Sequence, residues 1–447
     1  MQHIIIKHNG PIKDFEMDVN KFSILIGEQA TGKSTIAKSI YYSRYIKTLI
    51  SNFLIQVMED GTYYGEEVTK LKQFYRYISH NLKDIFIRLF GYSWELDPEF
   101  KIHYSFTEDI WFESILVSKG RGKKYISGNY SQALRDKINA LQEEALDLYR
   151  DIEKTQLSLE LRRETRSRNR EYILHKVNEV FNDDLTTYYI PAGRSMLTLL
   201  STNRATMNSL QNLDFVMDRF LELIDGIRSV YQEGVRKAFK YYPKGDRSFD
   251  VHSISDQIVE MQKGEYRNDR SGEILRILDG EDRYEDIKIN FASSGQQEIM
   301  WLLNFLYILM LRGEKAFVIV EEPEAHIYPT LQKEIIDFII QFVNICNGNA
   351  FVTTHSPYVL MTMNNAYYAG CLAVNNKTEV SKIIKSTYRI EKGRLTAMKL
   401  RKGADERAID LLDDNDEIRA YLIDDISTKI NEVYTSLYEI SEKEKGE

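Results

Sequence analysis

"GEQATGKST", residues 27–35, decides the fold of this chain. It satisfies the pattern G-x-x-x-x-G-K-[ST] and lies between an apolar run typical of a strand, "KFSILIG", and a segment of helical spacing that begins at residue 33. Glycines let backbone N–H groups curl around phosphates, and a helix N-terminus adds partial positive charge. We expect a loop that binds ATP with Mg²⁺, made of Gly27, Glu28, Gln29, Ala30, Thr31, Gly32, Lys33, Ser34 and Thr35.

Hydrolysis needs more than a phosphate loop. Lys33 is predicted to neutralise the β and γ oxygens of ATP, and the Ser34 hydroxyl to bind Mg²⁺. A carboxylate at a strand end must also organise Mg²⁺ and the attacking water. "AFVIVEEPEAH", residues 316–326, supplies a glutamate pair after a β-branched run. Such a pair alone is usually a solvated loop, but beside a phosphate loop we assign Glu321 to the water-mediated Mg²⁺ shell and Glu322 to polarising the water.

A histidine follows the next predicted strand. "AFVTTHSPY", residues 350–358, places His355 about thirty residues after the glutamates. A lone histidine is more often packed or solvent-facing than functional. In a parallel sheet, however, consecutive strand ends meet at one edge, so His355 is expected beside the glutamates, where it could sense a γ-phosphate.

The order of the elements predicts an α/β fold. After residue 283, strand-like and helix-like runs alternate, which is typical of a layered sheet with central parallel strands. Upstream, residues 100–118 read as a hairpin, and residues 130–182 as one long helix or a pair broken near "RRETRSRNR". Residues 371–376, 380–386 and 387–400 are short strand candidates.

These runs suggest five regions. They are an N-terminal lobe with the phosphate loop (1–125), a helical or short coiled-coil insertion (126–185), a mostly helical lid (186–282), a C-terminal lobe (283–400) and an acidic helical segment (401–447).

Composition excludes several classes of protein. A net charge of -8 argues against coating nucleic acid by bulk electrostatics. Two cysteines, Cys346 and Cys371, cannot build a disulfide framework, which favours a reducing compartment. The short apolar start reads as a strand rather than a signal peptide, and no apolar run reaches the length of a membrane span. We therefore expect a cytoplasmic protein with no membrane partner.

Taken in order, the motifs resemble the ABC-type P-loop ATPase head of the SMC, RecF and OLD-like families. "FASSGQQE", from residue 291, occupies the place of their signature motif, "EEPEAHIYP" that of Walker B and the D-loop, and "TTHSP" that of the switch histidine. The resemblance implies a homodimer that sandwiches ATP. Ser293 and Gly295 would then contact the γ-phosphate of the second subunit, Ser294 less so, and His326 would lie at the dimer seam. Glu321 departs from the aspartate of many ABC ATPases but suits the OLD-like branch.

Two absences narrow this resemblance. The helical arm is far too short for an SMC coiled coil, and about ninety residues after His355 are too few for the Toprim nuclease of full OLD proteins. The remaining layout resembles the ATPase subunits of antiphage systems such as Septu and PARIS. By that analogy the chain would be a switch and scaffold for a separately encoded nuclease or effector protein, with DNA or a phage protein as a further partner.

Two other functions stay open. A RecF-like DNA-repair role would use two basic stretches as phosphate contacts, each of which could equally be a solvated surface. They contain Lys119, Arg121, Lys123 and Lys124, and Arg162, Arg163, Arg166, Arg168 and Arg170. A nuclease in this chain alone would use the acidic stretch "DLLDDNDE", residues 410–417, although acidic helix faces are usually just solvated.

Overall fold

The computed structural model describes residues 1–61, 70–91, 97–119, 123–155, 158–202, 214–242, 249–270, 272–278, 283–402, 408–413, 417–419 and 432–435. Its central sheet has six strands in the order β14 (Ala408–Asp410), β13 (Leu395–Leu400), β3 (Phe22–Gly27), β12 (Asn349–Thr354), β11 (Ala316–Glu321) and β7 (Thr186–Ile190). All neighbours in this sheet are parallel except β13 and β14. The predicted α/β class with central parallel strands is confirmed.

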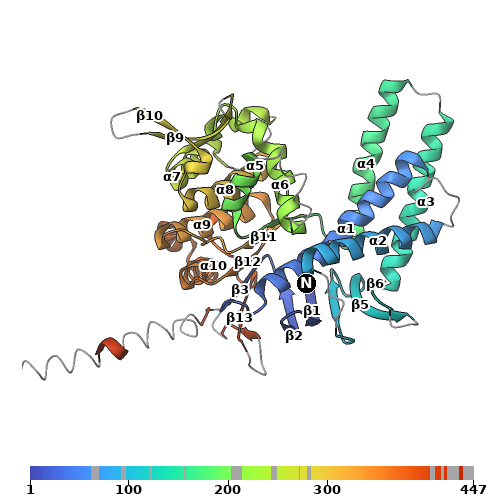
Figure 1. Cartoon of the computed structure of the whole chain (residues 1–447), viewed down its shortest axis with the longest axis horizontal. Coiled ribbons are helices and arrows are strands. Elements are labelled where there is room, and N and C mark those ends of the chain that lie inside the picture. The colour runs from blue at the N-terminus through green and yellow to red at the C-terminus, as the bar shows by residue number, and fades with distance from the viewer. Residues whose placement is uncertain are drawn as a thin grey trace, which may run out of the picture.

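The central strands are buried on both faces because alternate residues enter two different cores. Ile24, Val318 and Val352 pack into one core, whereas Leu25 and Ile319 pack into the other. This explains why β3 and β11 read as continuous apolar runs. The strands run between the helices at the left and those at the right of Figure 1.

Helices α5–α10 lie on the side of the central sheet whose core contains Ile24, Val318 and Val352. Their bounds are α5 Arg194–Thr202, α6 Phe215–Ile227, α7 Val251–Gln262, α8 Ser294–Arg312, α9 Pro329–Cys346 and α10 Pro357–Ile383, with 3₁₀ turns at Arg228–Tyr231, Val235–Tyr241, Ile289–Phe291 and Ser386–Tyr388. Helix α8 is buried along nearly its whole length and forms the centre of this core.

On the other side, α1 (Lys33–Asp60) leads away from the phosphate loop. It packs against α2 (Lys70–Phe90), α3 (Gln132–Lys154) and α4 (Leu159–Phe181). An antiparallel sheet completes this side, in the order β2 (Ile12–Val19), β1 (Gln2–Asn9), β4 (Lys101–Ser105), β5 (Trp111–Lys119) and β6 (Lys123–Tyr130). The hairpin expected over 100–118 is β4 and β5.

The arm over 130–182 is a pair of helices, α3 and α4 (Figure 1). The chain leaves α3 at Thr155 and enters α4 after its N-cap Ser158, so the Arg-rich stretch lies inside α4 rather than at the break. Ile138 of α3 and Val177 of α4 are buried in the core around α1. The arm is therefore anchored at its base by ordinary core packing.

Several element predictions are wrong. Residues 371–376 and 380–383 belong to α10, which is broken only by the non-helical backbone at Asn376, and within 387–400 the strand is limited to β13. Most described residues of 186–282 lie in helices, but the region also contains β7, which joins the central sheet, and β8 (Glu265–Asp269) and β9 (Gly272–Leu278), which pair with β10 (Tyr284–Lys288) in a small sheet that was not expected. After residue 401 the described residues form β14, a bridge between Leu412 and Ile418 and a helical turn at 432–435.

Candidate functional site

The phosphate loop connects β3 to α1 as the sequence predicts. Gly32 caps α1 in the left-handed region, at φ 102°, where a side chain would also collide with Ile12 of β2. A Cβ at Gly27 would lie 2.7 Å from the carbonyl oxygen of Leu400. Glycine is therefore required at both ends of the loop. The first amides of a helix have no intrahelical partner, so the start of α1 offers donors to an anion.

Lys33 lies at the centre of the site. Its side chain is buried, and its Nζ donates to the carbonyl oxygens of Gly27 and Glu28, both at 2.8 Å. The same Nζ lies 3.3 Å from Nδ1 of His355. Burial lowers the pKa of Lys33 to about 8, although the neighbouring glutamates raise it. The ammonium is thus held among acceptors, ready to exchange them for phosphate oxygens.

The glutamate pair and His355 meet because β11 and β12 are parallel neighbours. Glu321 pairs in register with Thr353, and the chain turns sharply at Glu322, which has a φ of 42°. The carboxylate of Glu322 lies 2.9 Å from Nε2 of His355. The structure brings these residues together at the carboxyl ends of the strands, beside the phosphate loop.

The partners of His355 fix its tautomer. The ammonium of Lys33 can only donate, so Nδ1 accepts, and in the neutral ring Nε2 carries the proton and lies 2.9 Å from the carboxylate of Glu322. A hydrogen bond from Lys33 to His355 is thus followed by an ion-pair contact from His355 to Glu322. These two contacts link the cation of the phosphate loop to the carboxylate assigned to the water.

Glu324 was not singled out from the sequence. Its Oε1 accepts from the Thr354 hydroxyl (2.6 Å) and from the backbone N–H of His355 (2.7 Å). These bonds hold the strand end that carries the histidine. The carboxylate lies within the quoted "EEPEAH", and its position two residues after Glu322 was the available signal.

Glu321 fits the outer shell of a divalent cation. It is buried at the end of β11, and its Oε2 accepts from the N–H of Ala192 at 3.5 Å. Its Oε1 is buried near Tyr189 and makes no hydrogen bond of ordinary geometry. Its Oε2, which is bonded only at 3.5 Å to the N–H of Ala192, can accept from a water in the shell of Mg²⁺. Ser34, the other predicted Mg²⁺ ligand, is exposed at the start of α1.

The predicted signature residues form the first turn of α8. The Ser293 hydroxyl accepts from the N–H of Gln296, and the Gln296 side chain accepts from the N–H of Ser293, which is a capping box. Ser293 and Ser294 are exposed. A Cβ on Gly295 would lie 2.9 Å from the carbonyl oxygen of His326, which is itself exposed and at positive φ. The hydrogen bonds of the Ser293 N–H and hydroxyl go to Gln296, and among the described residues none joins Ser293 to the phosphate loop of its own chain.

Sequence reasoning also missed Arg194. This residue begins α5 within "IPAGRS", is fully buried, and donates to the carbonyl oxygens of Glu321 (2.8 Å) and Glu322 (3.1 Å). It also pairs with the buried carboxylate of Glu298 in α8. Nothing local marks it, because most of its partners lie more than 100 residues away in sequence.

The sequence profile of the family described as "AAA ATPase domain" matches residues 101–360, more than half of the 447 residues. The chain belongs to this family. The matched range contains the glutamates, His355 and Ser293 of the AAA ATPase domain, whereas the phosphate loop precedes it.

Individual proteins are more distant. Protein ea59 of Escherichia phage lambda is 22% identical over 179 residues, which cover 38% of this chain and 32% of ea59. This AAA ATPase thus spans about a third of the length of the curated relative it matches. Among solved structures, an SMC head bound to the C-winged helix domain of ScpA has a TM-score of 0.38 at 11% identity, covering 92% of this chain and 96% of that one. The SMC head domain from Thermotoga maritima has a TM-score of 0.34 at 9% identity, covering 91% and 97%.

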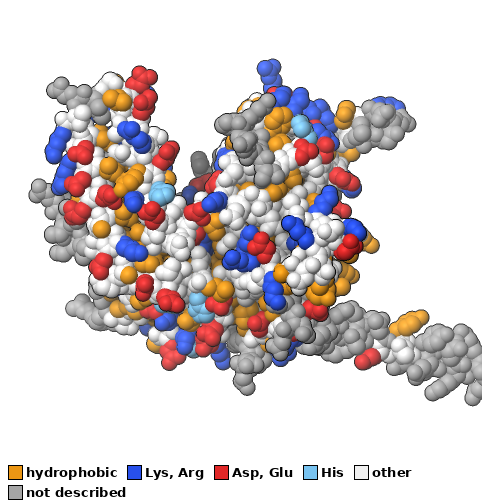
Figure 2. Space-filling view, turned by 180° about the vertical axis from the view of Figure 1, so that it is seen from behind, with side chains coloured by type: hydrophobic (Ala, Val, Ile, Leu, Met, Phe, Trp, Pro, Cys, Tyr) orange, Lys and Arg blue, Asp and Glu red, His pale blue; other side chains and the backbone are white. Residues whose placement is uncertain are grey.

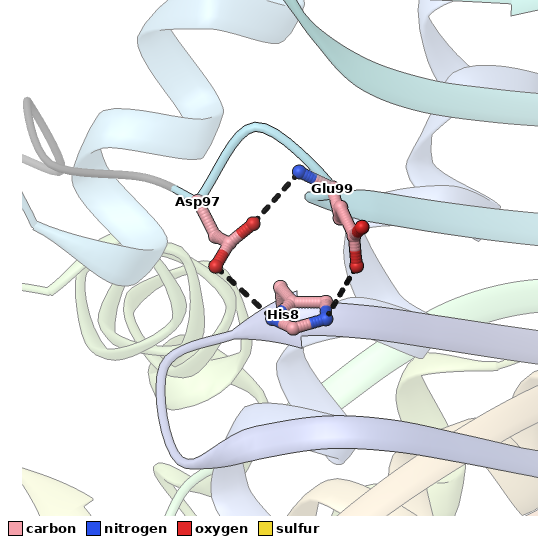
Figure 3. Close-up of side chains that lie close together, drawn as sticks. All are labelled: His8, Asp97 and Glu99. Carbon is pink, nitrogen blue, oxygen red and sulfur yellow. Dashed lines mark hydrogen bonds and ion pairs between the residues drawn. The ribbon is translucent and has the colours of Figure 1, made fainter.

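A histidine and two carboxylates cluster near the phosphate loop of the AAA ATPase (Figure 3). His8 Nδ1 lies 3.3 Å from Asp97, and its Nε2 lies 3.1 Å from Glu99. The two carboxylates face opposite ring nitrogens, and one ligand atom from each of the three residues lies within 4.8 Å of the others. These ion-pair contacts connect the end of β1 to the segment before β4.

The basic stretches of the AAA ATPase differ in how they are placed. Arg163, Arg166, Arg168 and Arg170 are exposed on α4, while Arg162 lies 3.7 Å from Glu153. In the other stretch, Arg121 and the side chains of Lys119 and Lys123 lie outside the described residues. Figure 2 shows acidic and basic side chains interspersed over the arm rather than gathered in one field. Within the described part of the chain, no helix is long and apolar enough to cross a membrane.

Proposed function

We propose that this AAA ATPase binds and hydrolyses ATP at the site formed by the phosphate loop, Glu322 and His355. The observation that carries the proposal is the series of close contacts from Lys33 to His355, through a hydrogen bond, and from His355 to Glu322, through an ion-pair contact. It joins a phosphate-binding cation to a carboxylate at a strand end, as hydrolysis of a phosphoanhydride requires.

Each residue has a distinct task in this proposal. The amides of the loop and Lys33 bind the β and γ oxygens, and Lys33 exchanges its carbonyl acceptors for them. Glu322 accepts a hydrogen bond from the attacking water and orients it. His355 holds the carboxylate of Glu322 through Nε2–H. Ser34 and Glu321 would hold Mg²⁺ directly and through water, and the ion supplies charge neutralisation at the phosphates.

The exposure of Ser293 supports an assembly of two chains around ATP. Its polar groups face solvent, and the capping box already satisfies the first turn of α8 internally. A second chain could bring its own bound ATP to this turn, so nucleotide would favour the dimer by binding it better than the monomer. On the analogy of motif layout, we assign the dimer the role of a cytoplasmic switch and scaffold for a separate nuclease or effector in antiphage defence.

Two substitutions test this function. Lys33→Ala should abolish nucleotide binding, because the loop loses its only lysine and the charge on the phosphates is unopposed. Glu322→Gln should keep binding and trap an ATP-bound dimer, which mass measurement with and without ATP would detect. Turnover at the wild-type rate in the Glu322→Gln protein would refute the assignment.

A role in DNA repair is the second candidate, favoured by the exposed arginines of α4. Measuring duplex-DNA affinity against salt separates the two functions, since each phosphate neutralised steepens the salt dependence. Replacing Arg163, Arg166 and Arg170 by glutamine should flatten that slope by about three phosphate contacts if α4 binds DNA. A flat slope in the wild-type protein would remove this candidate.

A further inference from the structure

We propose that Arg194 is a positioning residue for Glu322 and that it couples the first turn of α8 to the end of β11. This inference rests on the proposed ATP hydrolysis at Glu322. It assigns to the buried pair of Arg194 and Glu298 a part in the reaction that neither side chain could play by touching the nucleotide, since both are fully buried.

The guanidinium of Arg194 is saturated by main-chain carbonyls around the glutamate pair. Its Nη1 donates to Pro191 and Glu321, both at 2.8 Å, and its Nη2 donates to Glu322 at 3.1 Å. A planar fork with fixed N–H directions holds two successive carbonyl groups in one geometry. Arg194 therefore sets the path of the backbone at the point where β11 ends.

The backbone at that point needs such a constraint. Glu322 has a φ of 42°, which L residues with a side chain rarely adopt. Conformations of this kind persist only where the surroundings fix them, and they cluster at functional sites. The N–H of Glu322 is held by Thr353 of β12 (2.9 Å) and its carbonyl by Arg194. With both ends of the residue fixed, its carboxylate reaches His355.

Glu298 of α8 holds Arg194 from the opposite side, and we call this pair of residues the clamp. Its Oε2 accepts from the N–H of Arg194 (3.0 Å), and its Oε1 accepts from the N–H (3.1 Å) and hydroxyl (2.8 Å) of Ser195. Arg194 Nε donates back to the carbonyl oxygen of Glu298 at 2.9 Å. Glu298 lies three residues after Gly295, within the first two turns of α8. Movement of the first turn of α8 is thus transmitted through Glu298 and Arg194 to Glu322.

A buried ion pair is a poor way to gain stability, because desolvation of the two charges offsets their attraction. An apolar pair of similar volume would serve the core at least as well, but it could not hold the carbonyls of Glu321 and Glu322. The pair is therefore explained better by the geometry it imposes than by the energy it supplies. This difference makes a positioning role separable from a structural one.

The test compares Arg194→Lys, Arg194→Met and the double variant Arg194→Met, Glu298→Leu. Arg194→Lys keeps a cation but loses the fork, so we expect kcat for ATP to fall on the order of 100-fold from misplacement of Glu322, with nucleotide affinity within a few fold of wild type. Arg194→Met should also lower the Tm, because it strands the charge of Glu298. The double variant should recover much of that Tm while kcat stays low.

Three outcomes overturn the proposal. They are wild-type kcat in Arg194→Lys, recovery of kcat together with Tm in the double variant, and unchanged amide hydrogen exchange over residues 320–328 in Arg194→Lys. The exchange measurement needs no turnover, and exchange over 349–354 is its internal control. If the wild-type protein releases no phosphate, the proposed function fails by itself, and faster exchange at 320–328 still supports the clamp.

Discussion

The phosphate loop and the first turn of α8 are both glycine-containing entries into a helix, yet their polar groups point to different places. In the phosphate loop, Lys33 is buried and contacts His355 of the same chain, which in turn contacts Glu322. At α8, Ser293 is exposed, and its hydrogen bonds are satisfied within the turn. The polar groups of the phosphate loop therefore face the interior of their own chain. The first turn of α8 satisfies its own hydrogen bonds and leaves its outer face exposed to solvent.

This difference teaches which half of the site a single chain can assemble. Convergent buried groups are preorganised, so the phosphate loop needs only the nucleotide. The α8 turn can recognise only what another molecule brings to its exposed face. The residues between them, Glu298 and Arg194, are the physical connection between the two halves.

The largest expected effect on hydrolysis comes from the interior half of the site, which is the phosphate loop with Glu322 and His355. Glu322→Gln should lower the rate of phosphate release by about 10²- to 10⁴-fold, because the amide is a far weaker acceptor for the proton of the water. Nucleotide affinity should stay unchanged. The exposed Glu334→Gln on α9 is the matched control and should turn over normally. Equal losses in both variants would show that the effect is not specific to the site.

A substitution in the exposed first turn of α8, the open half of the site, should block ATP hydrolysis without affecting nucleotide binding. Ser293→Arg places a bulky cation on the exposed turn, so a single chain should still bind nucleotide with wild-type Kd. ATP-dependent assembly should be blocked, and hydrolysis should fall on the order of 100-fold, since the donor offered to the other chain is lost. Ser293→Ala removes only the helix cap, at a cost of ~1 kcal/mol in stability. Loss of nucleotide binding by Ser293→Arg would contradict the in-trans assignment.

The sequence predicted the ends of the parallel strands but not what holds them. Apolar runs followed by polar residues located β3, β11 and β12, and their parallel order then placed Glu322 and His355 together. Arg194 could not be found in this way, because a turn such as "IPAGRS" is uninformative about partners 104 and 127 residues away.

The strands predicted within the α10 region were wrong for a different reason. Its stretches "CLAVNN" and "VSKIIKS" are short, apolar and bounded by polar residues, which favours strands locally. The fold overrides this preference by packing Leu360, Met363 and Tyr367 of α10 into the core beside α9, at helical spacing. The non-helical backbone at Asn376 lies at the end of "CLAVNN", one of the two stretches with this local preference for a strand.

The pH dependence of nucleotide binding should sharpen the description of the interior half. The pKa of Lys33 is about 8, and bound phosphate would raise it, so binding above pH 8 must take up a proton. Affinity should already be about twofold lower at pH 8 than well below the pKa and should then fall by up to about tenfold per pH unit. Titration with a fluorescent nucleotide would measure this. Lys33→Arg should bind without the slope, and a slope that persists in it would assign the titration elsewhere.

The smallest expected effect concerns the contact between α8 and the loop after Glu322. Gly295→Ala places a Cβ 2.9 Å from the carbonyl oxygen of His326, so the two segments must separate by a few tenths of an ångström. We expect a loss of about 1–3 kcal/mol in the free energy of unfolding, measured by chemical denaturation. Gly226→Ala within α6, where a Cβ meets nothing within 4 Å and φ is not positive, is the matched helical control. An equal loss in both variants would remove the contact as the cause.

The position of β3 in the central sheet has a consequence for biosynthesis. Residues 22–27 are made early, but their two neighbours, β12 and β13, begin at residues 349 and 395. The antiparallel sheet and α1–α4 need only the first 181 residues, so this side can form while the rest of the chain is still being translated. A nascent chain shorter than about 350 residues carries the complete phosphate-loop sequence on a strand with no partner. Nucleotide binding is therefore acquired near the end of synthesis, which keeps incomplete chains from competing for ATP.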